Sequence, residues 1–97
     1  MNISICDSDK KICENISNLI RAEKIDAKIF TFTSKEEILH SKENFSICFL
    51  DIKGVDGLEI AKILRRREKI LQTSPSVLIF VTGYDDFMAE AFDVHAF

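Results

Sequence analysis

The chain has 97 residues and a mass of 11.1 kDa, which fits one small domain. Hydrophobic residues make up 46% and charged residues 30%, a balance that excludes intrinsic disorder. The net charge of −3 gives no overall attraction to nucleic acid or to an anionic membrane. No apolar run is long enough to span a membrane, and the N-terminus does not read as a signal peptide, so we expect a cytoplasmic domain without a membrane partner.

The first half of the chain alternates between short apolar runs and helical spacing. A strand is predicted over residues 3–6, followed by a helix over about residues 9–24. A second strand is predicted over residues 27–32, and Ser34 then begins a short helix with Glu37 at the spacing of a capping box. The first helix should bury one apolar stripe, formed by Ile12, Cys13, Ile16, Leu19 and Ile20.

The second half continues the alternation. A third strand is predicted over residues 45–50, and a third helix from Leu58 to about Ile70. The fourth strand, Val77–Val81, is wholly apolar, and a fourth helix is predicted over residues 85–94. The core face of the third helix should consist of Leu58, Ala61, Ile63 and Leu64. Residues 94–97 read as the start of a fifth strand, so we expect residues 1–97 to form one domain that is incomplete at its C-terminal end.

Strands this apolar, each followed by a helix, predict a parallel sheet that is covered on both faces. Right-handed crossovers then give a doubly wound, flavodoxin-like α/β fold, a three-layer α/β/α sandwich with strand order 2-1-3-4. Its fifth strand and fifth helix are missing or truncated. The fourth strand consequently has an open edge, which we expect to form a homo-oligomer or a domain-swapped dimer with another copy of the chain.

Polar side chains follow the apolar strands at the rim where the carboxyl ends of the strands meet. Asp7 and Asp9 follow the first strand, Asp51 ends the third, and Thr82 follows the fourth. Asp7 and Asp51 should flank the point where the strand order reverses, which is where open α/β sheets bind ligands. Neighbouring carboxylates repel one another unless a cation lies between them, and an oxygen-only cluster favours Mg²⁺.

A carboxylate in such a site can attack phosphorus and become an acyl phosphate. Thr82 would then hydrogen-bond the phosphoryl group, and Gly83 would leave the backbone open to close approach. Each of these residues also has a simpler interpretation, because an aspartate after a strand is commonly a turn or cap residue. The run Arg65-Arg66-Arg67 fits a solvated helix end better than a nucleic-acid contact.

Two further groups of residues have no clear chemical role. His40 and His95 each lack a partner at metal-binding spacing. The three cysteines fit neither a zinc site nor a disulfide framework, and small buried side chains are the simplest interpretation; they are Cys6, Cys13 and Cys48.

Three segments at the strand ends resemble one known family: ICDSD at residues 5–9, FLDI at 49–52 and FVTGY at 80–84. They are similar to the receiver domain of a bacterial response regulator. The longer run FVTGYDDFMAEAFDVHAF, residues 80–97, resembles the subclass whose receivers precede a LytTR-type DNA-binding domain.

The resemblance implies a phosphoacceptor domain of a two-component system, which takes a phosphoryl group from a sensor histidine kinase and is not an enzyme with turnover. It implies that Asp51 is the phosphoacceptor, that Asp7 is a metal-binding acid, and that Lys53 offers its backbone carbonyl to Mg²⁺. Thr82 and Gly83 would form the switch region that contacts the phosphoryl group. DNA would be bound only by a downstream domain that is not in this chain.

The sequence departs from the family pattern in three places. Ser8 stands where the family usually has a second acid, so Mg²⁺ should bind weakly unless Ser8 or Asp9 adds a ligand. The loop after Asp51 is about two residues shorter than in the family and lacks its proline, and the family's lysine after the fifth strand lies beyond Phe97. These departures leave open a degenerate receiver that acts as a phosphorylation-independent interaction or dimerisation module. A flavodoxin-like cofactor binder is a third interpretation, although the first strand lacks a glycine-rich phosphate loop.

Overall fold

The structure, a computed structural model, describes residues 1–81. The predicted fourth helix, the start of a fifth strand, and Thr82, Gly83 and His95 lie outside the described residues. Strands and helices alternate throughout the described part, as predicted. The elements are β1 (Asn2–Cys6), α1 (Lys10–Ala22), β2 (Lys28–Phe32), α2 (Lys35–His40), β3 (Ile47–Asp51), α3 (Gly57–Leu71) and β4 (Val77–Val81).

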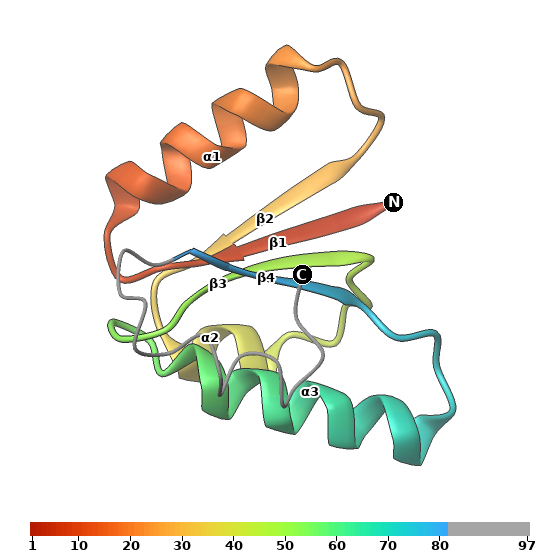
Figure 1. Ribbon diagram of the computed structural model, residues 1–97. Helices are drawn as coiled ribbons and strands as arrows, with labels where there is room; N and C mark the ends of the chain where they lie inside the picture. The colour runs from red at the N-terminus through yellow and green to blue at the C-terminus, as the bar shows by residue number, and fades with distance from the viewer. Residues whose placement is uncertain (82–97) are drawn as a thin grey trace.

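The four strands form one parallel sheet in the order β2-β1-β3-β4, which confirms the predicted order. In the central strand β1, Cys6 lies opposite Phe32 of β2 and Leu50 of β3. Figure 1 shows α1 on one face of this sheet and α2 and α3 on the other, so the three-layer α/β/α architecture is also confirmed. Within residues 1–81, β4 pairs with β3 alone.

Helices α1 and α2 begin at polar residues whose side chains bind free backbone amides. The Asp9 side chain accepts a hydrogen bond from the Lys11 N–H at 2.9 Å and so caps α1. Ser34 Oγ accepts from the Glu37 N–H at 3.2 Å and caps α2. The predicted capping box is altered, because Glu37 receives the N–H and hydroxyl of Thr33 instead of the Ser34 N–H. These bonds from Thr33 lower the pKa of the Glu37 carboxyl.

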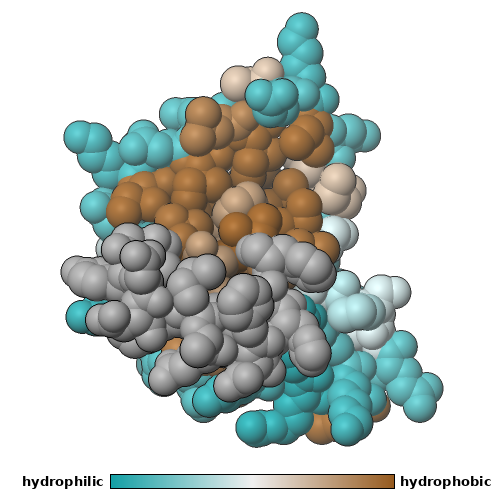
Figure 2. All heavy atoms as spheres, viewed as in Figure 1, coloured by the Kyte–Doolittle hydropathy of each residue, from teal (hydrophilic) through white to brown (hydrophobic). Residues whose placement is uncertain are grey.

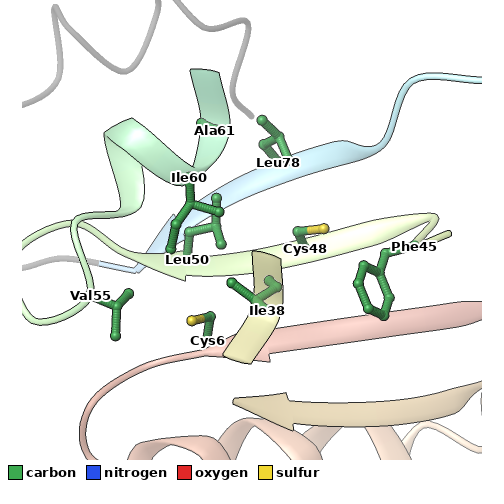
Figure 3. Close-up of a cluster of buried hydrophobic side chains, with 9 residues drawn as sticks. All are labelled: Cys6, Ile38, Phe45, Cys48, Leu50, Val55, Ile60, Ala61 and Leu78. Carbon is green, nitrogen blue, oxygen red and sulfur yellow. The ribbon is translucent and has the colours of Figure 1, made fainter. Parts of the chain in front are cut away.

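Two hydrophobic clusters lie on opposite faces of the sheet. The larger one fills the space between the sheet and helices α2 and α3 (Figure 3), and its buried members are Cys6, Ile38, Phe45, Cys48, Leu50, Val55, Ile60, Ala61 and Leu78. The smaller one lies beneath α1, and its buried members are Ile3, Ile5, Cys13 and Ile20. None of the helices in residues 1–81 is long and apolar enough to cross a membrane.

Several predicted details were wrong. Leu19 was expected inside the apolar stripe of α1 but is 69% exposed. In α3 two side chains are fully buried, Ala61, which the predicted core face included, and Ile60, which it omitted, whereas Ile63 is only half-buried. The third strand begins at Ile47, two residues later than predicted. Phe45 lies before that strand but is still buried.

The burial of Phe45 has a clear cause in its aromatic contacts. Its ring meets Phe30 and Phe32 edge-on, at centroid distances of 5.5 and 5.9 Å. The packing of this ring therefore does not depend on strand pairing.

Candidate functional site

Asp7 and Asp51 lie next to each other at the carboxyl rim of the sheet. Asp7 follows β1 directly and Asp51 is the last residue of β3, while their predecessors Cys6 and Leu50 are partners in the β1–β3 register. Asp7 is 5% exposed, and Asp51 is half-buried. The structure therefore brings these two predicted site residues together.

Each of the two carboxylates is held by a backbone amide of the loop that follows it. The Asp9 N–H donates to Asp7 Oδ1 at 2.9 Å, and the Gly54 N–H donates to Asp51 Oδ2 at 2.9 Å. No donor in residues 1–81 binds the other oxygen of either carboxylate. One oxygen of each acid is consequently left to meet a cation or a ligand.

The ionised form of Asp7 is electrostatically unfavourable at this site. Burial raises the pKa of its carboxyl above the ordinary value, the Asp9 N–H acts in the opposite direction, and the charges of Asp51 and Asp9 raise the pKa further. A cation between Asp7 and Asp51 would relieve this cost, because it would neutralise two charges that repel one another.

The two residues that follow Asp7 have other surroundings than Asp7 and Asp51. Ser8 is exposed and neutral, and Asp9 caps α1 with its own carboxylate. Among residues 1–81, no three His, Cys, Asp or Glu side chains form a group that could hold a metal ion. The acidic donor set therefore consists of Asp7 and Asp51.

The loop after β3 adds a contact that the sequence analysis missed. Gly54 lies against the Asp51 carboxylate, and a Cβ atom at position 54 would fall inside the contact distance of Asp51 Oδ2 and Ser8 Oγ. The signal was available in the sequence, since a loop amide close after an aspartate at a strand end commonly binds its carboxylate. Lys53 is exposed in the same loop.

Other candidate residues have structural contacts away from the rim. Arg65 is half-buried and binds Glu68 and the Ser76 carbonyl, each at 2.8 Å, so it ties α3 to the segment before β4. His40 Nδ1 lies 2.7 Å from the Glu36 carbonyl oxygen within α2. All three cysteines are buried free thiols, and burial raises the pKa of Cys6 to about 12.

No protein-family model matches the sequence, but individual proteins do. The heme response regulator HssR of Staphylococcus epidermidis is 32% identical over 106 residues, which cover 97% of this chain and 46% of HssR. The sensory transduction protein LytT of Bacillus cereus is 38% identical over 63 residues, which cover 63% of this chain and 23% of LytT. The chain thus spans less than half the length of these curated relatives.

The fold is similar to that of solved response regulators. The crystal structure of the response regulator TrrA from Thermotoga maritima, in complex with Mg²⁺ and BeF, superposes with a TM-score of 0.77 at 25% identity. The match covers 94% of this chain and 78% of TrrA. With the strand order and the paired acids at the rim, these similarities show that the chain belongs to the receiver domains of response regulators.

Proposed function

We propose that this receiver domain accepts a phosphoryl group on Asp51 from a histidine kinase and passes the signal to an output domain. The observation that carries this proposal is the pairing of Asp51 with the buried Asp7 at the rim between β1 and β3. Two like charges are held together there at an electrostatic cost. An ionisable group whose pKa is shifted by burial and by a charged neighbour is typical of a functional site.

The proposed reaction uses the oxygen of Asp51 that the loop leaves without a hydrogen bond. Oδ1 would donate an electron pair to phosphorus while the P–N bond to the donor histidine breaks. The electron pair of that bond stays on the imidazole nitrogen, and Asp51 becomes an acyl phosphate. The domain itself would supply this chemistry once per signal, without turnover of a small substrate.

The oxygen donors at the rim fit Mg²⁺ as the accompanying ion. Asp7 and Asp51 would hold it through their side chains, and Lys53 through its backbone carbonyl. The ion supplies positive charge that offsets the negative charge of an incoming phosphoryl group. We expect weak affinity, because Ser8 carries no charge and Asp9 caps α1.

Phosphorylation by a small donor tests the proposal directly. The chain should gain one phosphoryl group by intact mass when it is incubated with phosphoramidate and Mg²⁺, and hydroxylamine should remove the group. Asp51→Asn should abolish this gain. Asp56→Asn is a matched control, since Asp56 is an exposed acid of the same loop that pairs with Lys35 at 3.8 Å. Uptake that persists in the Asp51→Asn variant would contradict the assignment.

A degenerate receiver is the second candidate function, and two observations favour it. Ser8 stands where the family usually has an acid, and the loop after Asp51 is shorter than in the family. In this case the wild-type chain would take up no phosphoryl group, and its binding to a partner would be the same with and without phosphoramidate.

The open edge of β4 supports a second copy of the chain as a partner. Within residues 1–81 this apolar strand is paired on one side only, and an unpaired strand edge favours pairing with another chain. Sedimentation velocity should show a species larger than the monomer as the concentration rises. A strictly monomeric chain at all concentrations would contradict this part of the proposal.

The output step lies outside this chain. We propose a downstream LytTR-type DNA-binding domain, which the similarity to LytT supports. The chain itself, with its net charge of −3, would make no contact with DNA.

A further inference from the structure

The short loop between β3 and α3 folds directly back over the Asp51 carboxylate. Its Gly54 N–H binds Asp51 Oδ2 at 2.9 Å, and the Gly57 N–H closes the loop on the Ile52 carbonyl at 3.1 Å. Asp56, at the start of α3, has a left-handed backbone with φ 57° and pairs with Lys35 of α2 at 3.8 Å. The loop is therefore tied both to the acid and to a neighbouring helix.

The contact with Asp51 requires a residue without a side chain at position 54. A Cβ atom there would meet Asp51 Oδ2 on one side and Ser8 Oγ on the other, both inside contact distance. The backbone conformation of Gly54 does not itself demand glycine, since its φ is not positive. Glycine is required because space is lacking: the loop after β3, which contains Gly54, and the loop after β1, which contains Ser8, meet over Asp51 Oδ2.

We propose that Gly54 is a positioning residue for phosphoryl transfer to Asp51. A carboxylate has two equivalent oxygens and rotates about the Cβ–Cγ bond, so neither oxygen is aimed by the side chain alone. The Gly54 amide binds Oδ2 and thereby presents Oδ1 to the incoming phosphorus. Hydrogen bonds to a charged acceptor are roughly twice as strong as neutral ones, which makes one amide sufficient to select the orientation. The inference rests on the proposed phosphoacceptor function of Asp51.

The first test needs neither a metal nor a phosphoryl donor. In the wild-type chain the Gly54 amide should be protected against hydrogen exchange, because it donates to Asp51 Oδ2. Asp51→Ala removes this acceptor and should speed exchange of the Gly54 amide. The Asp9 amide is a matched control, because it donates to Asp7 Oδ1 and should keep its protection in the Asp51→Ala variant. A Gly54 amide that exchanges equally fast in the wild type and in the Asp51→Ala variant would overturn the inference.

The second test compares two variants of the loop. Gly54→Ala should slow phosphorylation by phosphoramidate on the order of 100-fold, the effect of misplacing a reacting group by about 1 Å. Val55→Ala controls for loss of stability, since Val55 belongs to the same loop and its side chain is buried in the larger cluster. Its rate should fall only in proportion to the unfolded fraction, which is measured in parallel. Equal rates per folded molecule in the two variants would overturn the positioning role.

The two tests separate this inference from the function on which it rests. If Asp51 is phosphorylated while the Gly54 amide exchanges equally fast in the wild type and in the Asp51→Ala variant, the proposed function stands and the positioning role is wrong. If the wild-type chain takes up no phosphoryl group from phosphoramidate, the proposed function and the positioning role are both wrong. If the Gly54→Ala variant does not fold, the exchange rates of the wild type and of the Asp51→Ala variant still decide whether Gly54 holds the acid.

Discussion

Within residues 1–81, the two faces of the sheet are covered very differently. In this described part, the face beneath α2 and α3 holds nine buried residues of the larger cluster, whereas the face beneath α1 holds four of the smaller cluster. Beside α1 lies an apolar groove of about 350 Å³, and Glu23 is the one charged residue among those of residues 1–81 that line it. Its other lining residues are Ile16, Leu19, Ile20, Ile25, Phe49, Ile79 and Val81. Figure 2 shows hydrophobic residues gathered on this side of the molecule.

The difference follows from the width of the elements. A helix with its side chains is about 10–12 Å across, and strands lie about 4.8 Å apart, so one helix cannot cover a sheet of four strands. On the other face, α2 and α3 together cover the sheet. On the α1 face the side chains of Phe49 and Ile79 stay half-buried. Leu19 extends from α1 toward solvent for the same reason, since no second helix of residues 1–81 meets it.

The largest expected effect compares one apolar residue from each face. Ile60→Ala should lower the free energy of unfolding by about 2–5 kcal/mol, because Ile60 is fully buried in the larger cluster. Leu19→Ala should change it by about 0.5 kcal/mol or less, since Leu19 is 69% exposed. Urea denaturation followed by circular dichroism measures both. An equally large loss in the Leu19→Ala variant would show that the groove is covered in solution.

Helix capping offers a smaller contrast between the faces. Ser34→Ala and Asp9→Ala should each cost about 1 kcal/mol, since each removes the side chain that caps a helix. Hydrogen exchange should place the loss from Asp9→Ala mainly in α1, which packs against the smaller cluster. Uniform loss of protection across the sheet in that variant would argue that both faces open together.

At the rim between the faces, the charge of Asp7 should make stability depend on pH. Burial raises the pKa of the folded-state carboxyl above its unfolded value, so the ionised form destabilises the fold at neutral pH. As the pH falls through the raised pKa, the folded protein binds the proton first and the cost disappears. Asp7→Asn should therefore stabilise the chain at pH 7, with a gain that shrinks on acidification. Thermal melts across the pH range check this, and a gain that is constant with pH would contradict the cause given.

The mildest test leaves the sequence unchanged and uses the buried thiols. Cys13 belongs to α1 and is buried in the smaller cluster, Cys48 belongs to β3 and is buried in the larger one, and burial raises the pKa of both thiols. Both should react slowly with a thiol reagent, and Cys13 should react first, because opening of the less-covered face costs less free energy. Labelling followed by peptide mass analysis gives the order. Faster labelling of Cys48 would contradict the prediction that the face beneath α1 opens more easily than the face beneath α2 and α3.

Local patterns in the sequence were enough to predict the order of elements and the pairing of Asp7 with Asp51. Alternation of apolar runs and helical spacing depends on neighbouring residues only, and the handedness of crossovers then limits the strand order. A residue that directly follows one strand of a parallel sheet lies at the same rim as the residues that follow the other strands. This placement does not depend on how the rest of the domain packs. The sequence alone therefore predicts that the two acids lie together.

Tertiary structure alone decided how the faces are covered and how the acids are held. The spacing of Leu19 is that of a buried residue, yet its exposure depends on whether a second helix lies beside α1. The use of Asp9 as a cap and of the Gly54 amide as a partner for Asp51 depends on how each loop turns back on its strand. Periodicity describes which side of an element is apolar, whereas burial and hydrogen bonding depend on what the rest of the chain places against that side.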